Sequence, residues 1–356
     1  MLINDISIVV QGAVDKTETP KCLKSIRQYL PNAEIILSTW EGTDLSCIEG
    51  LYDKLVLSKD PGGVFYEKKK YYQNINRQIV STKAGLELAE RKFIMKLRSD
   101  LIFTNNTFLD YFEKFNQRID EYKLFEHKIL VPATFTRFQY KQNSIKTPFH
   151  VSDWWYLGLN QDIKKFFNAI EPVKEPNFSK YFEFHKDLKS PLEGYPTRYV
   201  PEQYFCLKAF GKYFSDIHME NLLDVNDDIC KKSDIAILNN FIVLEFKQHG
   251  IYTNKYPQSK DEKILGEYYC SLYNNIVYQS EYKRLIDKDY SFTERELEHL
   301  NSKSNIKFLK LHKYISLTKQ KKVSFSKKIE KIFLSIPLTG IDAIITFFFE
   351  KITGRI

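Results

Sequence analysis

The sequence predicts an α/β protein with a mostly parallel sheet flanked by helices. Short apolar runs rich in β-branched residues alternate with amphipathic segments over the first hundred residues, and strands separated by helices imply parallel pairing. The 356 residues are 43% hydrophobic and 28% charged, which suits a folded chain with a large core. We expect an α/β domain over residues 1–258, a helical lysine-rich extension over 259–330, and an amphipathic membrane-associating segment over 331–356.

Four apolar runs are the expected strands of this sheet. They cover residues 6–11, 34–38, 54–57 and 93–97. Between the first two runs we expect a helix with Thr19 as its N-cap and Pro20 at its first position, ending at Pro31.

The candidate site lies directly after these runs, because ligands of an open parallel sheet bind outside the carboxyl ends of its strands. The residues there are polar or glycine-rich in every case. They are Gln11-Gly12, Trp40-Glu41-Gly42, Asp60-Pro61-Gly62-Gly63 and Arg98-Ser99-Asp100.

The segment 74–89 predicts a helix with two distinct faces. Its apolar face consists of Ile75, Ile79, Thr82 and Leu86. A second stripe, at helical spacing, consists of Asn74, Arg77, Gln78 and Ser81. Side chains of this kind make directed hydrogen bonds, so we expect the stripe to bind a polar ligand such as a sugar or nucleotide. A helix that caps neighbouring loops is the alternative.

The positive charge of the chain is concentrated near its C-terminus. Residues 303–331 contain ten lysines and one acid, which accounts for the whole formal net charge of +8, and the mostly apolar segment 332–349 follows. This order suits a peripheral contact with an anionic membrane, whereas Asp342 disfavours a spanning helix. A C-terminal helix docked on the domain is the alternative. Because the rest of the chain is near neutral, we expect no nucleic-acid partner.

The sequence lacks the motifs of several other classes of protein. Five scattered cysteines without a CxxC pair predict neither a disulfide framework nor a zinc ribbon, and favour a reducing compartment. We expect no secretory signal before the first strand. A Walker loop, a GxSxG elbow, an HExxH motif and metal spacing among the seven histidines are all absent.

Seven segments, in this order, resemble the WavE lipopolysaccharide-synthesis family. They are ISIVVQGAV (6–14), CLKSIRQYLPNAEIILSTWEG (22–42), YDKLVLSKDPGG (52–63), NINRQIVSTKAGL (74–86), FIMKLRSDL (93–101), HVSDWWYLG (150–158) and PEQYF (201–205). The resemblance covers roughly residues 1–255. It implies a bacterial glycosyltransferase of the GT-A type that moves a sugar from a nucleotide-sugar donor to a lipopolysaccharide core, O-antigen or capsule acceptor. It also implies a cytoplasmic protein, peripheral on the inner membrane, whose C-terminal tail would bind anionic lipids.

The residues after the fourth strand depart from the pattern that the resemblance implies. GT-A enzymes commonly place two carboxylates there to hold Mg²⁺ or Mn²⁺ against the diphosphate, whereas this chain has Arg98-Ser99-Asp100. Either Asp100 holds a divalent metal, which is the alternative we prefer, or Arg98 and Lys96 neutralise the leaving diphosphate directly. An Arg98–Asp100 ion pair that only ties the strand to the next helix is the structural alternative.

An inverting glycosyl transfer also needs a base for the acceptor hydroxyl. The resemblance favours Glu202, at the start of a helix that Pro201 begins, with Asp153 as the second candidate. An acid in the first turn also stabilises a helix without any catalytic role. Trp154 and Trp155, beside Asp153, either stack on a sugar or fill the core.

The remaining expected contacts are with the nucleotide sugar. We assign them to Gln11, Gly12, Trp40, Glu41, Asp60, Gly62, Asn74, Arg77, Gln78, Lys96 and Arg98. The turn at Asp60 would let the backbone approach a base while its carboxylate accepts a hydrogen bond, although a bare turn has the same sequence. His218 and His249 are weaker candidates for a metal, and Arg198 is one for a phosphate.

The competing functions are a nucleotidyl- or phosphotransferase of polysaccharide precursors and a non-catalytic scaffold of a glycan assembly complex.

Overall fold

The computed structural model describes residues 5–68, 70–138, 146–192, 195–256, 275–294 and 297. The chain divides into two units, Met1–Lys288 and Asp289–Ile356. In the second unit the ring of Tyr290 packs edge-on against Phe292, with centroids 5.2 Å apart. The segment expected at 331–356, and most of the one at 259–330, lie outside the described residues. None of the helices in the described part of the chain is both long enough and apolar enough to span a bilayer.

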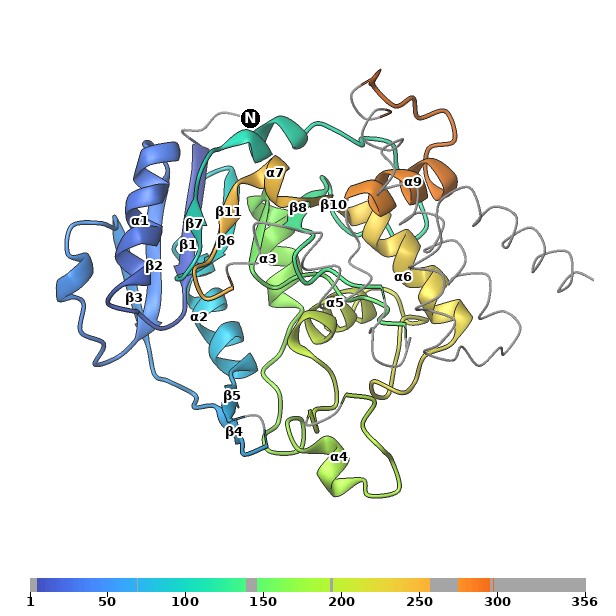
Figure 1. Cartoon of the computed structure of the whole chain (residues 1–356), viewed down its shortest axis with the longest axis horizontal. Helices are drawn as coiled ribbons and strands as arrows, with labels where there is room; N and C mark the ends of the chain where they lie inside the picture. The colour runs from blue at the N-terminus through green and yellow to red at the C-terminus, as the bar shows by residue number, and fades with distance from the viewer. Residues whose placement is uncertain are drawn as a thin grey trace, which may run out of the picture. The chain divides into compact units, whose positions relative to one another are not determined.

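A seven-stranded sheet forms the centre of the first unit (Figure 1). Its order is β10-β8-β9-β6-β1-β2-β3. The strands are β1 (Ile6–Gln11), β2 (Glu34–Trp40), β3 (Lys54–Ser58), β6 (Phe93–Arg98), β8 (Ile129–Pro132), β9 (Trp155–Leu159) and β10 (Phe241–Leu244). Strands β6, β1, β2 and β3 pair in parallel, and β9 runs antiparallel to both of its neighbours. The prediction of a mostly parallel sheet is confirmed.

The four predicted strands are all present; β1 has the predicted bounds, and the other three run one or two residues longer than predicted. Strand β2 continues through the buried residues Ser38, Thr39 and Trp40 because its pairing with β3 extends as far as Trp40 opposite Ser58. Strand β6 similarly includes Arg98, which lies opposite Gln11 of β1. Some of the polar residues expected just beyond the strands therefore belong to the last residue pair of two neighbouring strands.

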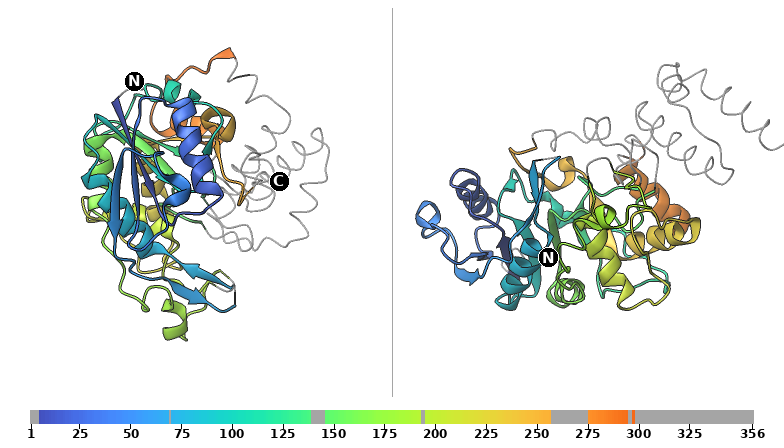
Figure 2. Two further views of the ribbon diagram at one scale, coloured as in Figure 1. Left: turned by 90° about the vertical axis from the view of Figure 1, so that its left-hand side faces the viewer. Right: turned by 90° about the horizontal axis from the view of Figure 1, so that it is seen from below.

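Helices cover both faces of the sheet (Figure 2). They are α1 (Glu18–Tyr29), α2 (Ile75–Glu87), α3 (Asn160–Asn168), α4 (Tyr181–Phe184), α5 (Pro201–Gly211), α6 (Asp227–Asn240), α7 (Phe246–His249) and α9 (Asn275–Leu285). Helix α1 lies on one face, and α2 and α3 lie on the other. Two short antiparallel pairs complete the unit: β4 (Val64–Tyr66) with β5 (Tyr71–Gln73), and β7 (Ile102–Phe103) with β11 (Ile251–Tyr252).

The start of α1 differs from the prediction. The carboxylate of Asp15 accepts hydrogen bonds from the backbone N–H groups of Thr17 and Glu18, at 2.7 and 2.8 Å, so the helix begins at Glu18. Thr19 lies inside the first turn, where its hydroxyl accepts from the Asp15 N–H at 2.9 Å. The assignment of Thr19 as N-cap is wrong because the Asp15 carboxylate satisfies two N–H groups that the helix leaves without partners.

Helix α2 packs its predicted apolar face directly on the sheet. Ile75, Ile79 and Leu86 are at most 2% exposed. At Gly85 a β-carbon would lie 2.3 Å from Cγ1 of Val9 in β1, so only glycine permits this approach. Because α2 runs back between two parallel strands, its N-terminal end, with the polar stripe, lies at the carboxyl edge of the sheet.

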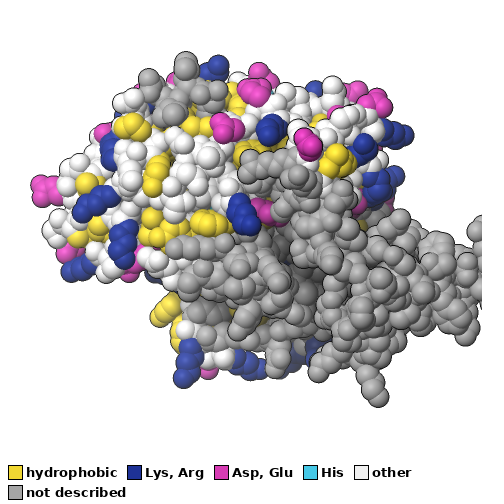
Figure 3. Space-filling view, turned by 45° about the horizontal axis from the view of Figure 1, so that its top comes forward, with side chains coloured by type: hydrophobic (Ala, Val, Ile, Leu, Met, Phe, Trp, Pro, Cys, Tyr) yellow, Lys and Arg dark blue, Asp and Glu magenta, His cyan; other side chains and the backbone are white. Residues whose placement is uncertain are grey.

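The surface of the described residues shows no single basic patch in the view of Figure 3. Lysine and arginine side chains there are interspersed with aspartate and glutamate. This pattern agrees with a sequence in which the excess of lysine begins only near residue 303.

Candidate functional site

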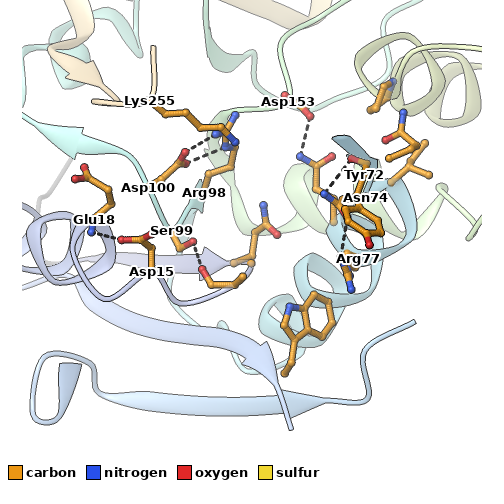
Figure 4. Close-up of a pocket in the computed structure, with 18 of the residues that line it drawn as sticks. Asp15, Glu18, Tyr72, Asn74, Arg77, Arg98, Ser99, Asp100, Asp153 and Lys255 are labelled. Carbon is orange, nitrogen blue, oxygen red and sulfur yellow. Dashed lines mark hydrogen bonds and ion pairs between the residues drawn. The ribbon is translucent and has the colours of Figure 1, made fainter. Parts of the chain in front are cut away.

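A cavity of about 940 Å³ opens at the carboxyl edge of the sheet (Figure 4). Ten of the fourteen predicted site residues line it: Gln11, Gly12, Trp40, Asp60, Asn74, Arg77, Gln78, Arg98, Asp100 and Asp153. Glu41, Gly62, Lys96 and Glu202 are not among its lining residues. Residues from four strand ends and from α2 therefore meet around one cavity.

Arg98 and Asp100 form a two-armed ion pair on the cavity wall. Nε of Arg98 donates to Oδ1 of Asp100 at 3.0 Å, and Nη2 donates to Oδ2 at 2.5 Å. The guanidinium also lies 5.0 Å from the ring centre of Trp154. Burial lowers the pKa of Arg98, but the charges of Asp100 and Asp153 outweigh this effect and raise the pKa overall. Arg98 is thus a fixed positive charge, one-fifth exposed, that faces the cavity.

A late segment of the chain, residues 253–256, supplies a second positive charge to the same wall. Lys255 lines the cavity, and Figure 4 shows its side chain on the side where Arg98 and Asp100 lie. The segment is tied down at both sides, because Thr253 donates to Oδ2 of Asp100 at 3.4 Å and Asn254 donates to Glu18 at 2.9 Å. Sequence reasoning missed these residues because no local motif marks them.

The donor atoms around Asp100 do not fit a resident divalent metal. Mg²⁺ and Mn²⁺ need several oxygen ligands, whereas both oxygens of Asp100 already accept from Arg98. In the part of the chain that the structure describes, no group of three or more His, Cys, Asp or Glu side chains is placed to hold a metal. The assignment of Asp100 as a metal ligand stays a prediction that this geometry does not support, and we derive no step through a metal.

Two carboxyl groups, Asp153 and Glu202, lie close enough to affect each other. Oδ2 of Asp153 accepts from Nε2 of Gln78 at 2.8 Å, which fixes the carboxylate in the cavity wall. Glu202 stands in the first turn of α5, directly after the lining residue Pro201. Burial, reinforced by the negative charge of Asp153, raises the pKa of Glu202 to about 7. A carboxyl group with such a pKa can hold or release a proton near neutral pH.

Lys96 lies behind the cavity wall rather than in it. Its side chain is fully buried on β6, opposite Tyr156 of β9, and its ammonium donates to the backbone carbonyl of Asp153. Burial lowers the pKa of Lys96 to about 7. The expected direct contact of Lys96 with a diphosphate has no support in this geometry. Lys96 instead positions the backbone of Asp153.

The turn at Asp60 is tied to helix α2. Both oxygens of Asp60 accept from Arg77, at 2.7 and 2.6 Å, and the hydrogen bonds from Arg77 lower the pKa of Asp60. Nη1 of Arg77 also donates to Oδ1 of Asn74 at 2.9 Å. A β-carbon on Gly63 would lie only 2.7 Å from that same oxygen. Arg77 thus occupies the Asp60 carboxylate that was expected to accept from a nucleotide base.

The floor of the cavity is built from the turn after β1. Gly12 adopts φ +116°, a conformation that favours glycine, and so turns the chain directly after Gln11. The Gln11 side chain accepts from the Ser81 hydroxyl at 2.7 Å, which links β1 to the buried edge of the polar stripe on α2. Ser99 donates to the Ala13 carbonyl at 2.7 Å and closes the turn.

The weaker candidates lie elsewhere. Burial lowers the pKa of His249 to about 3, and its ring packs against Trp155 in the core. Arg198 forms an ion pair with Glu220, and His218 lies 3.8 Å from the same carboxylate. Trp155 is fully buried and Trp154 is 3% exposed, so both fill the core rather than present a face to a sugar.

The fold and the cavity define an α/β protein with a polar cavity at the carboxyl edge of its sheet. The family model for WavE lipopolysaccharide synthesis matches residues 6–313, so the chain belongs to this family. The resemblance based on residues 1–255 is confirmed and extends into the lysine-rich region. No curated protein matches the sequence.

Solved structures of S. aureus TarS are distantly similar. The chain aligns with TarS 1–349 at 15% identity and a TM-score of 0.33, covering 58% of this chain and 55% of that one. With a second TarS structure the values are 13% identity and a TM-score of 0.36, covering 85% and 46%. The chain thus spans about half the length of these structures.

Proposed function

We propose that the protein is a GT-A-like glycosyltransferase that transfers a sugar from a nucleotide-sugar donor to a surface-glycan acceptor. Membership of a lipopolysaccharide-synthesis family supports the biological setting. The observation that carries the proposal is the meeting of three kinds of group around one cavity. These are the cations Arg98 and Lys255, the hydrogen-bonding stripe on α2, and the carboxylate of Asp153.

The donor binds with its diphosphate toward Arg98 and Lys255. Asp100 accepts from only two of the five N–H groups of Arg98, so the guanidinium keeps further donors for a diphosphate, and the ammonium of Lys255 adds others. Hydrogen bonds from these charged groups are stronger in a partly buried site than in water. The nucleoside lies toward Gly12, Trp40 and Asn74, where β1, β2 and α2 provide backbone and amide groups. Asp60 supports this end through Arg77 rather than by direct contact.

The Asp153–Glu202 pair removes the proton of the acceptor hydroxyl. Asp153 is the member that lines the cavity, and Gln78 holds its carboxylate in place. As the hydroxyl proton passes to the carboxylate, the acceptor oxygen forms a bond to the anomeric carbon of the donor sugar. The bond from that carbon to the diphosphate oxygen breaks, and the electron pair leaves with the nucleoside diphosphate, whose charge Arg98 balances.

The acceptor is a glycolipid or polysaccharide of the lipopolysaccharide core, O-antigen or capsule. We place the reaction on the cytoplasmic face of the inner membrane, with the domain over residues 1–258 carrying the site and the tail over 331–356 contacting anionic lipids. No nucleic-acid partner is part of the proposal, in keeping with the interspersed charges in Figure 3.

Calorimetric titration with a panel of UDP-, GDP-, ADP- and CMP-sugars tests the proposal. We expect one nucleotide class to bind and to raise the melting temperature, since a ligand at 100 times its Kd stabilises by about 2.7 kcal/mol. Because the donor atoms around Asp100 do not fit a metal, binding should persist in EDTA. Failure of every nucleotide sugar to bind would contradict the proposal. Binding without sugar transfer to any glycan acceptor would favour a non-catalytic scaffold.

A further inference from the structure

The β4–β5 hairpin presents two aromatic side chains to solvent on one face. Phe65 and Tyr72 lie directly opposite each other in the antiparallel register, and their ring centres are 5.0 Å apart. Phe65 is 44% exposed and Tyr72 is 54% exposed. In Figures 1 and 2 the hairpin extends away from the seven-stranded sheet, below α2.

The opposite face of the hairpin anchors it to the domain. Tyr66 follows Phe65 in β4, so its side chain points to the other face, where it is only 4% exposed. The hairpin is therefore held by one face while its other face offers an aromatic pair to a partner. Single exposed apolar residues are ordinary, whereas two exposed rings in contact on a projecting element indicate a contact surface.

The turn of the hairpin is basic. The sequence from 67 to 70 reads EKKK, and Lys68 and Lys70 are exposed. Lysines beside exposed aromatic rings suit the interface of an anionic bilayer, where the rings lie at headgroup level and the ammonium groups meet lipid phosphates.

We propose that the β4–β5 hairpin docks on an anionic membrane surface, inserting Phe65 and Tyr72 among the headgroups. This contact is separate from any made by the tail over residues 331–356. It does not depend on the glycosyltransferase proposal, because neither the aromatic pair nor the lysines take part in the transfer. Since Tyr72 also lines the cavity, docking would bring the cavity to the bilayer surface.

Tryptophan fluorescence with vesicles tests this docking in the full chain. The native tryptophans Trp40, Trp154 and Trp155 are at most 9% exposed, so Phe65→Trp adds an exposed reporter. With vesicles of phosphatidylglycerol and brominated phosphatidylcholine, we expect its emission to shift to the blue and to be quenched. Tyr213→Trp is the matched control, because Tyr213 is also 44% exposed, and it should be neither shifted nor quenched. Vesicle binding that leaves Phe65→Trp unquenched, or quenches both variants equally, would overturn the proposal.

A charge reversal tests the basic turn. Lys68→Glu should weaken binding to phosphatidylglycerol vesicles about 30-fold at low salt, with a much smaller effect in high salt. The control is Lys231→Glu on α6, an exposed lysine with the same change of charge. Equal losses for the two variants in vesicle flotation would contradict the assignment. A blue shift of the Phe65→Trp emission with a soluble anionic oligosaccharide, but not with vesicles, would also contradict the assignment.

Discussion

Arg98 and Asp100 face the cavity as one unit, joined by hydrogen bonds of 3.0 and 2.5 Å. The pair stands at the end of β6, where the resemblance led us to expect a carboxylate with a metal. Because Asp100 holds the guanidinium from one side, the positive charge is fixed at the cavity wall before any ligand binds. In our proposal, the N–H groups of Arg98 that Asp100 does not accept from bind the diphosphate.

Replacing Arg98 tests this role. Arg98→Gln should weaken the binding of a nucleoside diphosphate by about 10- to 100-fold, the loss expected for a hydrogen bond to a charged group. Arg27→Gln is the control, because Arg27 also forms an ion pair, with Asp53 at 2.7 Å, and does not line the cavity. Calorimetric titration of both variants gives the comparison. Equal affinity in Arg98→Gln and the wild type would remove Arg98 from the diphosphate site.

Asp153→Asn tests the base. Asparagine keeps an oxygen that can accept from Gln78, so the wall of the cavity should remain in place. We expect kcat to fall about 10²- to 10⁴-fold, with little change in donor affinity. Asp228→Asn, at an exposed aspartate of α6, controls for the loss of one carboxylate. A parallel loss of donor affinity and kcat would instead indicate a binding role.

The carboxyl group of Glu202 should make stability depend on pH. Burial raises its pKa from 4.5 to about 7, so the folded protein binds the proton more tightly than the unfolded chain does. Stability should therefore fall as the pH rises from about 4.5 to about 7, by on the order of 2 kcal/mol. Glu202→Gln should lessen this fall in a series of urea unfolding curves. Burial also raises the pKa of Asp234 to about 7, but Asp234 is present in both proteins, so its effect cancels in the comparison. Identical pH profiles for variant and wild type would contradict the raised pKa of Glu202.

Gly63→Ala should disturb the donor site without unfolding the domain. The added β-carbon would lie 2.7 Å from Oδ1 of Asn74 and 3.2 Å from Nη1 of Arg77. These two side chains can move, and the backbone carbonyl of Gln73, 3.1 Å from the added β-carbon, needs only a small shift. We therefore expect a small change in melting temperature and a clear loss of nucleotide affinity. An unchanged affinity in calorimetric titration would separate this end of the cavity from nucleoside binding.

Gly85→Ala, unlike Gly63→Ala, should lower the stability of the domain. Its β-carbon would meet Cγ1 of Val9 at 2.3 Å and Cβ of Ser38 at 3.1 Å, both on packed strands. We expect a loss of about 1–3 kcal/mol in the free energy of unfolding, as for other overpacked cores. Urea unfolding measures the loss, and a stability equal to that of the wild type would contradict the close contact of α2 with β1.

The parts of the fold that follow from local patterns were predictable. The parallel strands β1, β2, β3 and β6 are apolar runs, and the buried face of α2 repeats at helical spacing. The position of the cavity follows from the rule for parallel sheets, since the strand ends are adjacent whatever the loops between them do.

The parts that depend on distant contacts were not predictable. Lys255 reaches the wall beside Asp100 through packing between segments far apart in the sequence. The ion pair between Asp60 and Arg77 joins a turn to a helix 17 residues later, and neither residue alone indicates it. The burial of Lys96, by contrast, could have been predicted, because a lysine inside the apolar run FIMKL of a central strand has to be buried.

A crystal structure with a bound nucleoside diphosphate, of the nucleotide class that the titrations select, would test the central claim most directly. Our account predicts the diphosphate within hydrogen-bond distance of Arg98 and Lys255, with the nucleoside between Trp40 and Asn74. A nucleotide bound outside this cavity, or a diphosphate that contacts neither cation, would contradict it.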